Sequence, residues 1–254
     1  MKGRVGCFAV LLCLARAGSL AAASPDELWR QARTAYEEGE FQEAARLYEE
    51  LASDWPGGWV FYNLGNARFK AGQLGEAVLA YKRAKWLLPR SREVEENLSQ
   101  AQRAVGMEKT GPPGVGLAFR DALHVLTEAE WLLVFSLFFA PGVLAGICWT
   151  WTRTANLRTA AFALIGAAAI VLSVVGLRVL LDMSYAEAVV VADEGFGFVA
   201  PHAGEDKAFR TTAGNLVYPT KRESADWTEV SLTDGTRGWM RNQDFVAVTE
   251  WRED

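Results

Sequence analysis

Two long apolar segments, residues 131–151 and 159–181, constrain the fold of this 254-residue chain more than any other feature. The first contains no charged side chain, and its length matches the roughly 20 residues that a membrane-spanning helix needs. The second contains one charge, Arg178, close enough to its end for the guanidinium to reach the membrane interface. The sequence therefore predicts a transmembrane hairpin over residues 131–181, with the segments before and after it on the same side of the membrane.

The N-terminus has the pattern of a secretory signal. Two basic side chains precede an apolar run over residues 5–14, and an A-x-A site precedes Ser24. This pattern predicts a signal peptide over residues 1–23. Because Arg16 interrupts the apolar region, the pattern leaves open whether the signal is cleaved or retained. In both cases the chain after it is expected to be exported.

The predicted connection between the two spans carries Arg153 and Arg158. With an exported N-terminal segment, both arginines face the cytoplasm, in agreement with the positive-inside rule. We therefore expect a protein of the bacterial inner membrane whose two flanking modules face the periplasm.

The composition limits the chemistry that the chain can perform. The three cysteines, Cys7, Cys13 and Cys148, lie in the predicted signal peptide or in a predicted span. The two histidines, His124 and His202, lie in different modules, so neither a metal site nor a histidine-based catalytic triad is expected. A net charge of −5 argues against nucleic acid as a partner. We expect no enzyme, no catalytic residues, no metal site and no cofactor.

Two amphipathic blocks before the hairpin, residues 28–51 and 61–88, superimpose at an offset of 33 residues. A period near 34, with small, aromatic and proline positions in this order, resembles the tetratricopeptide repeat family. The matching positions are Gly39 and Gly72, Phe41 and Leu74, Ala44 and Ala77, Tyr48 and Tyr81, and Pro56 and Pro89.

The matched residue types have physical roles in a pair of antiparallel helices. Gly65 and Ala77 are small enough for close helix approach, Tyr81 fills the space between the helices, and Pro89 ends the second helix. A further helix over residues 91–105 is expected to cap the stack, because two repeats alone bury little surface. The predicted repeat domain therefore spans residues 24–106.

The repeat resemblance implies that the first helix of each repeat contacts a protein partner. Carried over position by position, this implicates Trp29, Arg33, Tyr36, Tyr62, Asn66, Phe69 and Lys70. Asn66 occupies a position that the family often uses to hold a partner's backbone. The alternative for Tyr62 and Phe69 is packing against the neighbouring helix.

Charge differs between the two repeats. Residues 24–56 contain nine acids and three bases, whereas residues 57–90 contain six bases and one acid. This asymmetry is consistent either with a surface that orients a partner or with ordinary solvated helix faces.

A Gly-Pro-Pro-Gly sequence at residues 111–114 predicts a domain boundary within a linker over residues 107–130. Apolar residues interleaved with two charges over 117–126 predict a helix lying at the membrane interface. Thr127 and Glu130 have the spacing of a capping box, which predicts that the first spanning helix begins there.

After the hairpin, residues 185–254 contain short segments with an alternating pattern, separated by turn sequences. This pattern predicts short strands. A W-x-x-V motif at Trp227, an Asp-Gly turn at residues 234–235 and a G-W-aliphatic motif at residues 238–240 resemble the bacterial SH3-type domain. The resemblance implies a closed all-β barrel in which Gly238 permits close strand crossing and Trp239 fills the interior. Trp227 is either part of a groove for peptide or cell-wall ligands or a packing residue. The predicted strands are residues 188–192, 196–200, 216–218, 228–232, 238–241 and 245–248.

The whole chain is thus predicted to be multidomain, with all-α tetratricopeptide repeat helices, a transmembrane hairpin and a C-terminal SH3-like barrel. This order of parts resembles the BatE-like proteins of the Bacteroides aerotolerance gene cluster. The resemblance implies a non-catalytic scaffold with protein partners that carry von Willebrand A domains. The alternative is a cell-envelope sensor or anchor that binds peptidoglycan through the SH3-like domain.

Overall fold

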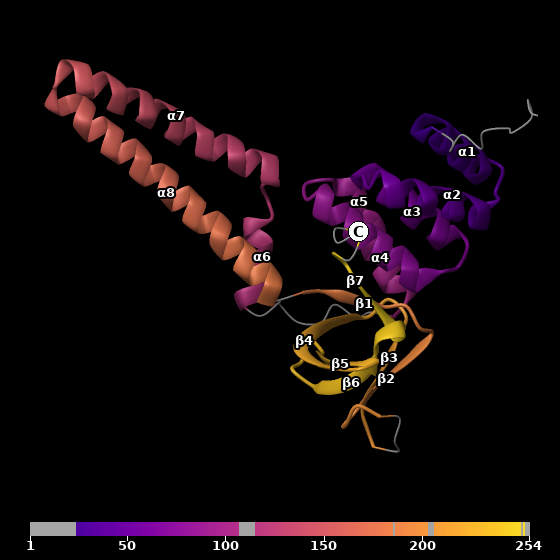
Figure 1. Cartoon of the computed structure of the whole chain (residues 1–254). Coiled ribbons are helices and arrows are strands. Elements are labelled where there is room, and N and C mark those ends of the chain that lie inside the picture. The colour runs from indigo at the N-terminus through magenta and orange to yellow at the C-terminus, as the bar shows by residue number, and fades with distance from the viewer. Residues whose placement is uncertain (1–23, 107–114, 185, 203–205, 250, 252–254) are drawn as a thin grey trace, which may run out of the picture.

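The computed structural model describes residues 24–106, 115–184, 186–202, 206–249 and 251, and the predicted signal peptide lies outside these residues. The described chain has three parts, which Figure 1 shows in sequence order. A helical repeat module comes first, a long helical hairpin follows, and an antiparallel sheet ends the chain.

The repeat module consists of two antiparallel helix pairs and a fifth helix. The first pair is α1 (Pro25–Glu37) and α2 (Phe41–Asp54), the second pair is α3 (Gly58–Lys70) and α4 (Leu74–Leu87), and α5 (Arg92–Ala104) follows. Within each pair the turn contains a glycine at positive φ, Gly39 at 83° and Gly72 at 81°, a conformation that favours glycine. The side chains of Ser24 and Ser91 cap α1 and α5 by accepting from backbone N–H groups.

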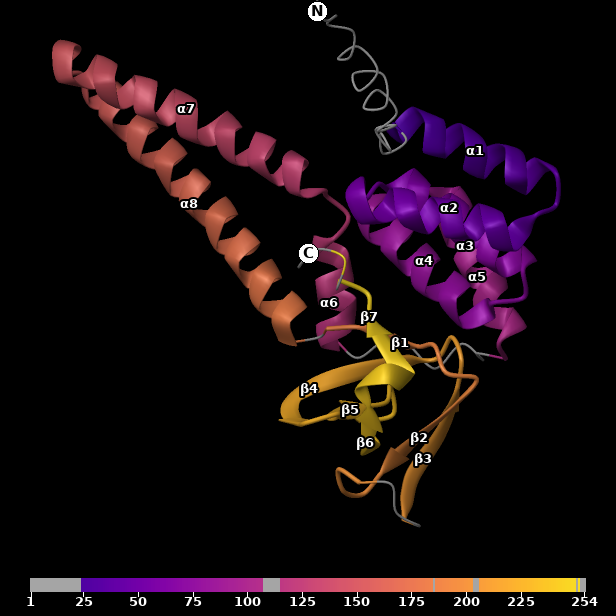
Figure 2. The ribbon, with the colours of Figure 1, turned by 45° about the vertical axis from the view of Figure 1, so that its right-hand side comes forward.

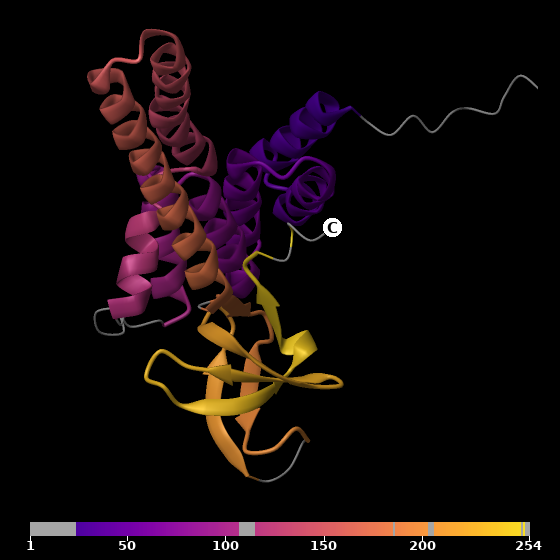
Figure 3. The ribbon, with the colours of Figure 1, turned by 60° about the vertical axis from the view of Figure 1, so that its left-hand side comes forward.

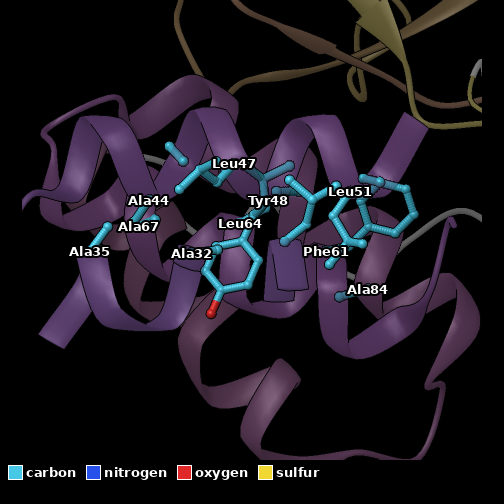
Figure 4. Packing of buried hydrophobic residues seen from close by; sticks show 14 of the residues in the cluster. Ala32, Ala35, Ala44, Leu47, Tyr48, Leu51, Phe61, Leu64, Ala67 and Ala84 are labelled. Carbon is cyan, nitrogen blue, oxygen red and sulfur yellow. The ribbon is translucent and has the colours of Figure 1, made fainter. Parts of the chain in front are cut away.

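Small side chains allow these helices to pack closely (Figure 4). Buried alanines alternate with a few large residues, which include Leu28, Leu47, Tyr48, Leu51, Phe61 and Leu64. The expected contact between Gly65 and Tyr81 is confirmed, because a Cβ atom on Gly65 would lie 2.7 Å from the Tyr81 ring. A larger residue at Gly65 would therefore force α3 and α4 apart.

Helix α6 (Val115–Leu123) connects the repeat module to the hairpin of α7 (Glu128–Thr152) and α8 (Ala155–Ser184). The capping box predicted at Thr127 and Glu130 is present at the start of α7. The connection between α7 and α8 is shorter than expected: Arg153, at φ 55°, ends α7 in the left-handed conformation. Arg158 therefore lies in the first turns of α8 rather than in a loop.

Helices α7 and α8 are both long and apolar enough to cross a membrane. In the most apolar stretch of α7 only 6% of the residues are buried inside the protein, and in that of α8 only 11%. The two helices therefore do not form the core of a soluble domain. Figures 1 and 2 show the two helices meeting at their turn and diverging toward α6. Small residues explain the close end, because a Cβ atom on Gly142 would lie 3.1 Å from Leu164, and Ala161 and Ala168 are buried.

Seven antiparallel strands form one sheet in the order β3-β2-β6-β5-β4-β1-β7. They are β1 (Ala188–Val190), β2 (Glu194–Phe198), β3 (Lys207–Thr212), β4 (Leu216–Ser224), β5 (Trp227–Ser231), β6 (Arg237–Arg241) and β7 (Phe245–Ala247). The predicted Asp-Gly turn joins β5 to β6, with Gly235 at φ 88°. Figure 3 shows the sheet curled beneath the repeat module and the hairpin.

Three sequence expectations for the sheet need correction. Strand β3 is absent from the predicted strands, because its sequence alternates weakly and carries the charges of Lys207 and Arg210. The closed barrel is not confirmed, since β3 and β7 are the two edges of the sheet rather than partners. Met240, not Trp239, fills the interior: Met240 is fully buried, whereas Trp239 points to the other face and is half-buried. The close approach at Gly238 is present, with Phe209 2.9 Å from the position of a Cβ atom.

Candidate functional site

The repeat module and the sheet share a hydrophobic core, so they are not two separate modules on a tether. Val189 of β1 and Val248 after β7 are buried in one cluster with Ala77, Val78 and Tyr81 of α4. Figure 2 shows β1 and β7 beside the lower end of the repeat module. Helix α4, the second helix of the second pair, is therefore covered by the C-terminal part of the same chain.

Glycine makes this close approach possible. A Cβ atom on Gly75, near the start of α4, would lie 2.9 Å from Ala213 and 3.1 Å from the carbonyl oxygen of Val190. On the sheet side, a Cβ atom on Gly214 would lie 3.0 Å from Val105 at the end of α5. The turn between β3 and β4 thus fits against both α4 and α5.

Helix α4 also supplies hydrogen bonds to the edge of the sheet. The guanidinium of Arg83 donates to the carbonyl oxygens of Ala247 and Val248, each at 3.3 Å. These contacts explain in part why the sheet stays open at β7, because an unpaired strand edge needs polar partners and a helix provides them here. The backbone N–H of Val248 donates to the carbonyl oxygen of Glu187 at 2.8 Å.

A buried ion-pair cluster joins α4, α6 and the segment before β1 at one point. Glu187, just before β1, accepts from Lys82 of α4 at 3.0 Å and from Arg120 of α6 at 2.7 Å. The Glu187 and Arg120 side chains are 14% and 6% exposed, and Arg120 also pairs with Asp121. Burial alone would raise the pKa of Glu187, but the positive charges of Lys82 and Arg120 outweigh it and lower that pKa to about 2.

A second polar group fixes α6 to the end of α8. Arg178 donates to Nδ1 of His124 at 3.0 Å, and Nε2 of His124 lies 2.7 Å from the carboxylate of Asp182. Because a guanidinium only donates, Nδ1 is the acceptor, and the ring proton lies on Nε2 and faces Asp182. The ring of His124 also packs on Trp86 of α4, with centroids 4.2 Å apart. The base of the hairpin is thus fixed to the repeat module through α6.

The predicted partner-binding residues of the first helix pair lie on one helix. Arg33 is exposed and pairs with Glu37 one turn later at 2.8 Å. Trp29 and Tyr36 are half-buried, and their rings meet Tyr48 and Phe41 edge-on. Burial raises the pKa of Tyr36. This face combines two aromatic rings with an exposed cation.

In the second helix pair most of the predicted residues contact the protein itself. The Asn66 side-chain oxygen accepts from the Tyr81 hydroxyl at 2.7 Å and from the Asn97 amide at 2.8 Å. The Asn97 amide also donates to the Tyr62 hydroxyl at 3.1 Å. Phe69 packs against the cluster shared with the sheet, whereas Lys70 is exposed in the last turn of α3. Asn66 thus orders α5 against α3.

Trp227, the residue proposed for an SH3-like groove, begins β5 and is half-buried. Its ring meets Phe198 edge-on at 5.5 Å, and the Arg241 guanidinium lies 5.4 Å from its centroid. It therefore has packing partners on its own sheet while part of the ring remains at the surface.

Sequence reasoning did not single out the residues that join the parts, chiefly Lys82, Arg83, Asn97, Arg120 and Glu187. They are far apart in the chain: Lys82 and Glu187 are separated by 105 residues. The sequence contains one signal for them, the excess of bases over residues 57–90. Two of those bases, Lys82 and Arg83, contact the C-terminal part of the chain.

In the described part of the chain, no three His, Cys, Asp or Glu side chains are placed to share a metal ion.

Comparison with known families agrees with the geometry of the repeat module. A tetratricopeptide repeat model matches residues 28–58. The match covers the first helix pair from Leu28 and reaches the start of α3. The repeat module thus contains a tetratricopeptide repeat, a unit that mediates protein–protein interaction. Neither the curated proteins nor the solved structures compared with the chain gave a match.

Proposed function

We propose that this chain is a non-catalytic scaffold of the bacterial inner membrane that presents its repeat module and its sheet to the periplasm for protein–protein interaction. The observation that carries the proposal is a tetratricopeptide repeat in a module that contacts the base of an apolar helical hairpin. A loosely tethered module would need only a linker, whereas here polar and apolar contacts hold the parts in one arrangement.

The apolar surface of the hairpin supports insertion in a membrane. Leu132, Leu133 and Leu137 on α7 are between 67% and 69% exposed, and such side chains in water would favour aggregation. Figures 1 and 2 show both other modules at the base of the hairpin, away from its turn. With Arg153 and Arg158 at the turn, the positive-inside rule favours a cytoplasmic turn and periplasmic modules.

The partner proposed is a membrane-associated protein with a von Willebrand A domain, by analogy with BatE-like proteins. The contact is proposed at the first helix of each pair. Arg33 and Lys70 are the exposed cations of this surface. Trp29 and Tyr36 would supply the aromatic contacts that dominate many interfaces.

Affinity capture of the full-length protein from its native membrane tests this proposal. The variant combines Arg33→Glu with Lys70→Glu, and the matched control is Arg92→Glu on α5, also an exposed arginine one turn from a glutamate. We expect the wild type and the control to capture the same membrane proteins and the double variant to lose them. Equal capture by all three would contradict the assignment of the surface.

Orientation is tested separately with alkaline phosphatase fused after residue 254 or between residues 153 and 154. The enzyme is active only after export, so we expect activity from the C-terminal fusion and none from the fusion at the turn. The reverse pattern would place the modules in the cytoplasm.

The second candidate, binding of peptidoglycan peptides, is favoured by the aromatic residues of the sheet. Phe196, Phe198 and Trp227 follow one another on the surface, with centroids 6.5 Å and 5.5 Å apart, and Lys207 lies over the Phe196 ring. Sedimentation of the full-length protein in detergent with purified cell wall tests it. Binding by the wild type and loss with Trp227→Ala would favour this candidate, and failure of the wild type to sediment would reject it.

A further inference from the structure

A cleft of about 770 Å³ opens between α7 and α8 at the base of the hairpin. Its volume lies within the range of small-molecule sites, about 300–1,000 Å³. The walls are apolar and come from both helices: Leu132 and Phe135 on α7, and Val171, Val175 and Val179 on α8. The floor is formed by other parts of the chain.

The cleft follows from the distribution of side-chain size along the hairpin. Near the turn, Gly142 and Ala161 allow the two helices to touch. Toward the base the facing positions carry larger residues, and α6 lies against α8 below them. The helices therefore diverge, as Figure 2 shows, and the space between them is not filled by the chain.

The floor of the cleft is charged, with both signs present. Arg120 and Arg178 supply two positive charges, and Glu128, Asp182 and Glu187 supply three negative ones. Both arginines are buried, at 5% and 6% exposed. They are oriented by the contacts described above rather than free to move away from the cleft. Trp86 of α4 and Trp131 of α7 complete the lining at the base of the hairpin.

We propose that this cleft binds one phospholipid with a zwitterionic headgroup, such as phosphatidylethanolamine. The inference rests on the membrane insertion proposed above. One acyl chain lies between α7 and α8, the phosphate faces Arg178 and Arg120, and the ammonium faces the carboxylates of Glu128 and Asp182.

The surroundings favour a lipid over the other candidates. Within a bilayer an apolar space open to its sides is filled by acyl chains, because water gains nothing from apolar walls. Charges of both signs on the floor match a zwitterionic headgroup better than a purely anionic one. Trp86 and Trp131, at the base of the hairpin, suit the boundary between acyl chain and headgroup.

The test uses the full-length protein in nanodiscs that contain equal amounts of phosphatidylethanolamine and phosphatidylglycerol. After transfer to a mild detergent, native mass spectrometry counts the lipids that remain bound. Val175→Trp places a bulky ring in the cleft between α7 and α8. Ile170→Trp is the matched control, because Ile170 lies on α8, is 67% exposed and does not line the cleft. Extraction of the membranes with alkaline carbonate reports insertion for every variant.

We expect the wild type and Ile170→Trp to retain one phosphatidylethanolamine per chain, and Val175→Trp to retain it about tenfold less often, since the tryptophan removes the apolar space that holds the acyl chain. Equal retention by Val175→Trp would overturn the site, and retention of phosphatidylglycerol would overturn the headgroup class. A partner helix crosslinked at position 175 would show that a protein occupies the cleft. Absence of bound lipid from wild-type protein that is inserted overturns this inference alone, whereas failure of the wild type to insert overturns the proposed function as well.

Discussion

The two helix pairs of the repeat module have related sequences but different surroundings. On the first pair, α1 and α2, most charged side chains pair within one helix at the surface, such as Arg33 with Glu37 and Arg46 with Glu43 and Glu50. On the second pair, α4 is covered by β1 and β7, and its Lys82 takes part in a buried ion-pair cluster. Sequence similarity between repeats therefore does not mean that both offer the same surface to a partner.

This difference also separates two kinds of electrostatic contact. Exposed pairs within a helix contribute little, because water screens the charges and the side chains lose entropy on pairing. A buried pair is different, since removal of one partner leaves an uncompensated charge in a poorly solvated place. The first helix pair should therefore tolerate substitution of its exposed charges. The junction, where Glu187 joins β1 to α4 and α6, should not tolerate loss of a charge.

The largest effect is expected from Glu187→Ala. It leaves Lys82 and Arg120 without their shared carboxylate, which should lower the free energy of opening of the junction by about 3–5 kcal/mol. Hydrogen exchange of the backbone amides of β1 and α4 measures this free energy. The control, Glu37→Ala, removes an exposed partner of Arg33 and should leave exchange at the junction unchanged. Similar exchange in both variants would contradict the expected difference between the buried ion pairs of Glu187 and the exposed ion pair of Glu37.

Acid should weaken the same junction in the wild type. The pKa of Glu187 is lowered from 4.5 to about 2 in the folded protein, so its contribution is complete above about pH 4.5. The contribution is lost as the pH falls from 4.5 toward 2, where Glu187 takes up a proton, and it amounts to roughly 3 kcal/mol. Hydrogen exchange as a function of pH, corrected for the intrinsic rate, measures this loss. Exchange at the junction in Glu187→Ala should not show this pH dependence. If the variant showed the same pH dependence as the wild type, another titrating group would be responsible.

A smaller effect is expected from Gly75→Val. Its Cβ atom would meet Ala213 and the backbone of Val190, which should cost about 1–3 kcal/mol and loosen the sheet from α4. The matched control is Gln100→Val, which places the same β-branched residue at an exposed position of α5. Limited proteolysis at the junction should be faster for Gly75→Val alone. Equal rates would show that the sheet adapts without undocking.

Asn66→Ala should be milder still. The change removes the acceptor for Tyr81 and Asn97, and we expect a loss of about 1–2 kcal/mol in the stability of α5 against α3. Hydrogen exchange of the α5 amides measures this loss. If Asn66 instead served only a partner, exchange in α5 would not change and partner capture would fall.

Arg33→Ala should produce the smallest structural effect. Arg33 is exposed and its ion pair with Glu37 lies within α1, so thermal unfolding should not change measurably. Capture of the partner should nevertheless fall, because the proposed interface loses a cation. A drop in thermal stability would show that the stability of the first helix pair depends on its exposed charges. The expected difference from the second pair, whose packing depends on Glu187, would then be contradicted.

The repeat helices and the hairpin could be predicted from local patterns in the sequence. The spacing of Ala44, Tyr48 and Leu51 along one face predicts a helix, and uninterrupted apolar residues over a sufficient length predict a membrane span. Capping at Thr127 was equally local. The exact bounds were less certain, since the left-handed conformation of Arg153 shortened the turn of the hairpin.

The sheet was predicted less completely. The Asp-Gly turn between β5 and β6 was correct because two adjacent residues determine it. Strand β3 depends on its pairing with β2, in which Arg210 lies opposite Phe196. The open edge at β7 depends on Arg83 of α4, which donates to the carbonyl oxygen of Ala247. The orientation of Met240 likewise follows from the register between β5 and β6 rather than from the G-W-aliphatic motif.

Local sequence patterns specify which segments are helices, which are apolar and which carry a repeat, because these properties depend on neighbours within a few turns or strands. The tertiary structure decided which surfaces remain open. Close contact at Gly75, the ion pairs of Glu187 and the hydrogen bonds of Asn66 each join positions that are distant in the chain. Such contacts depend on the shape and charge of the folded surfaces, which local periodicity does not encode.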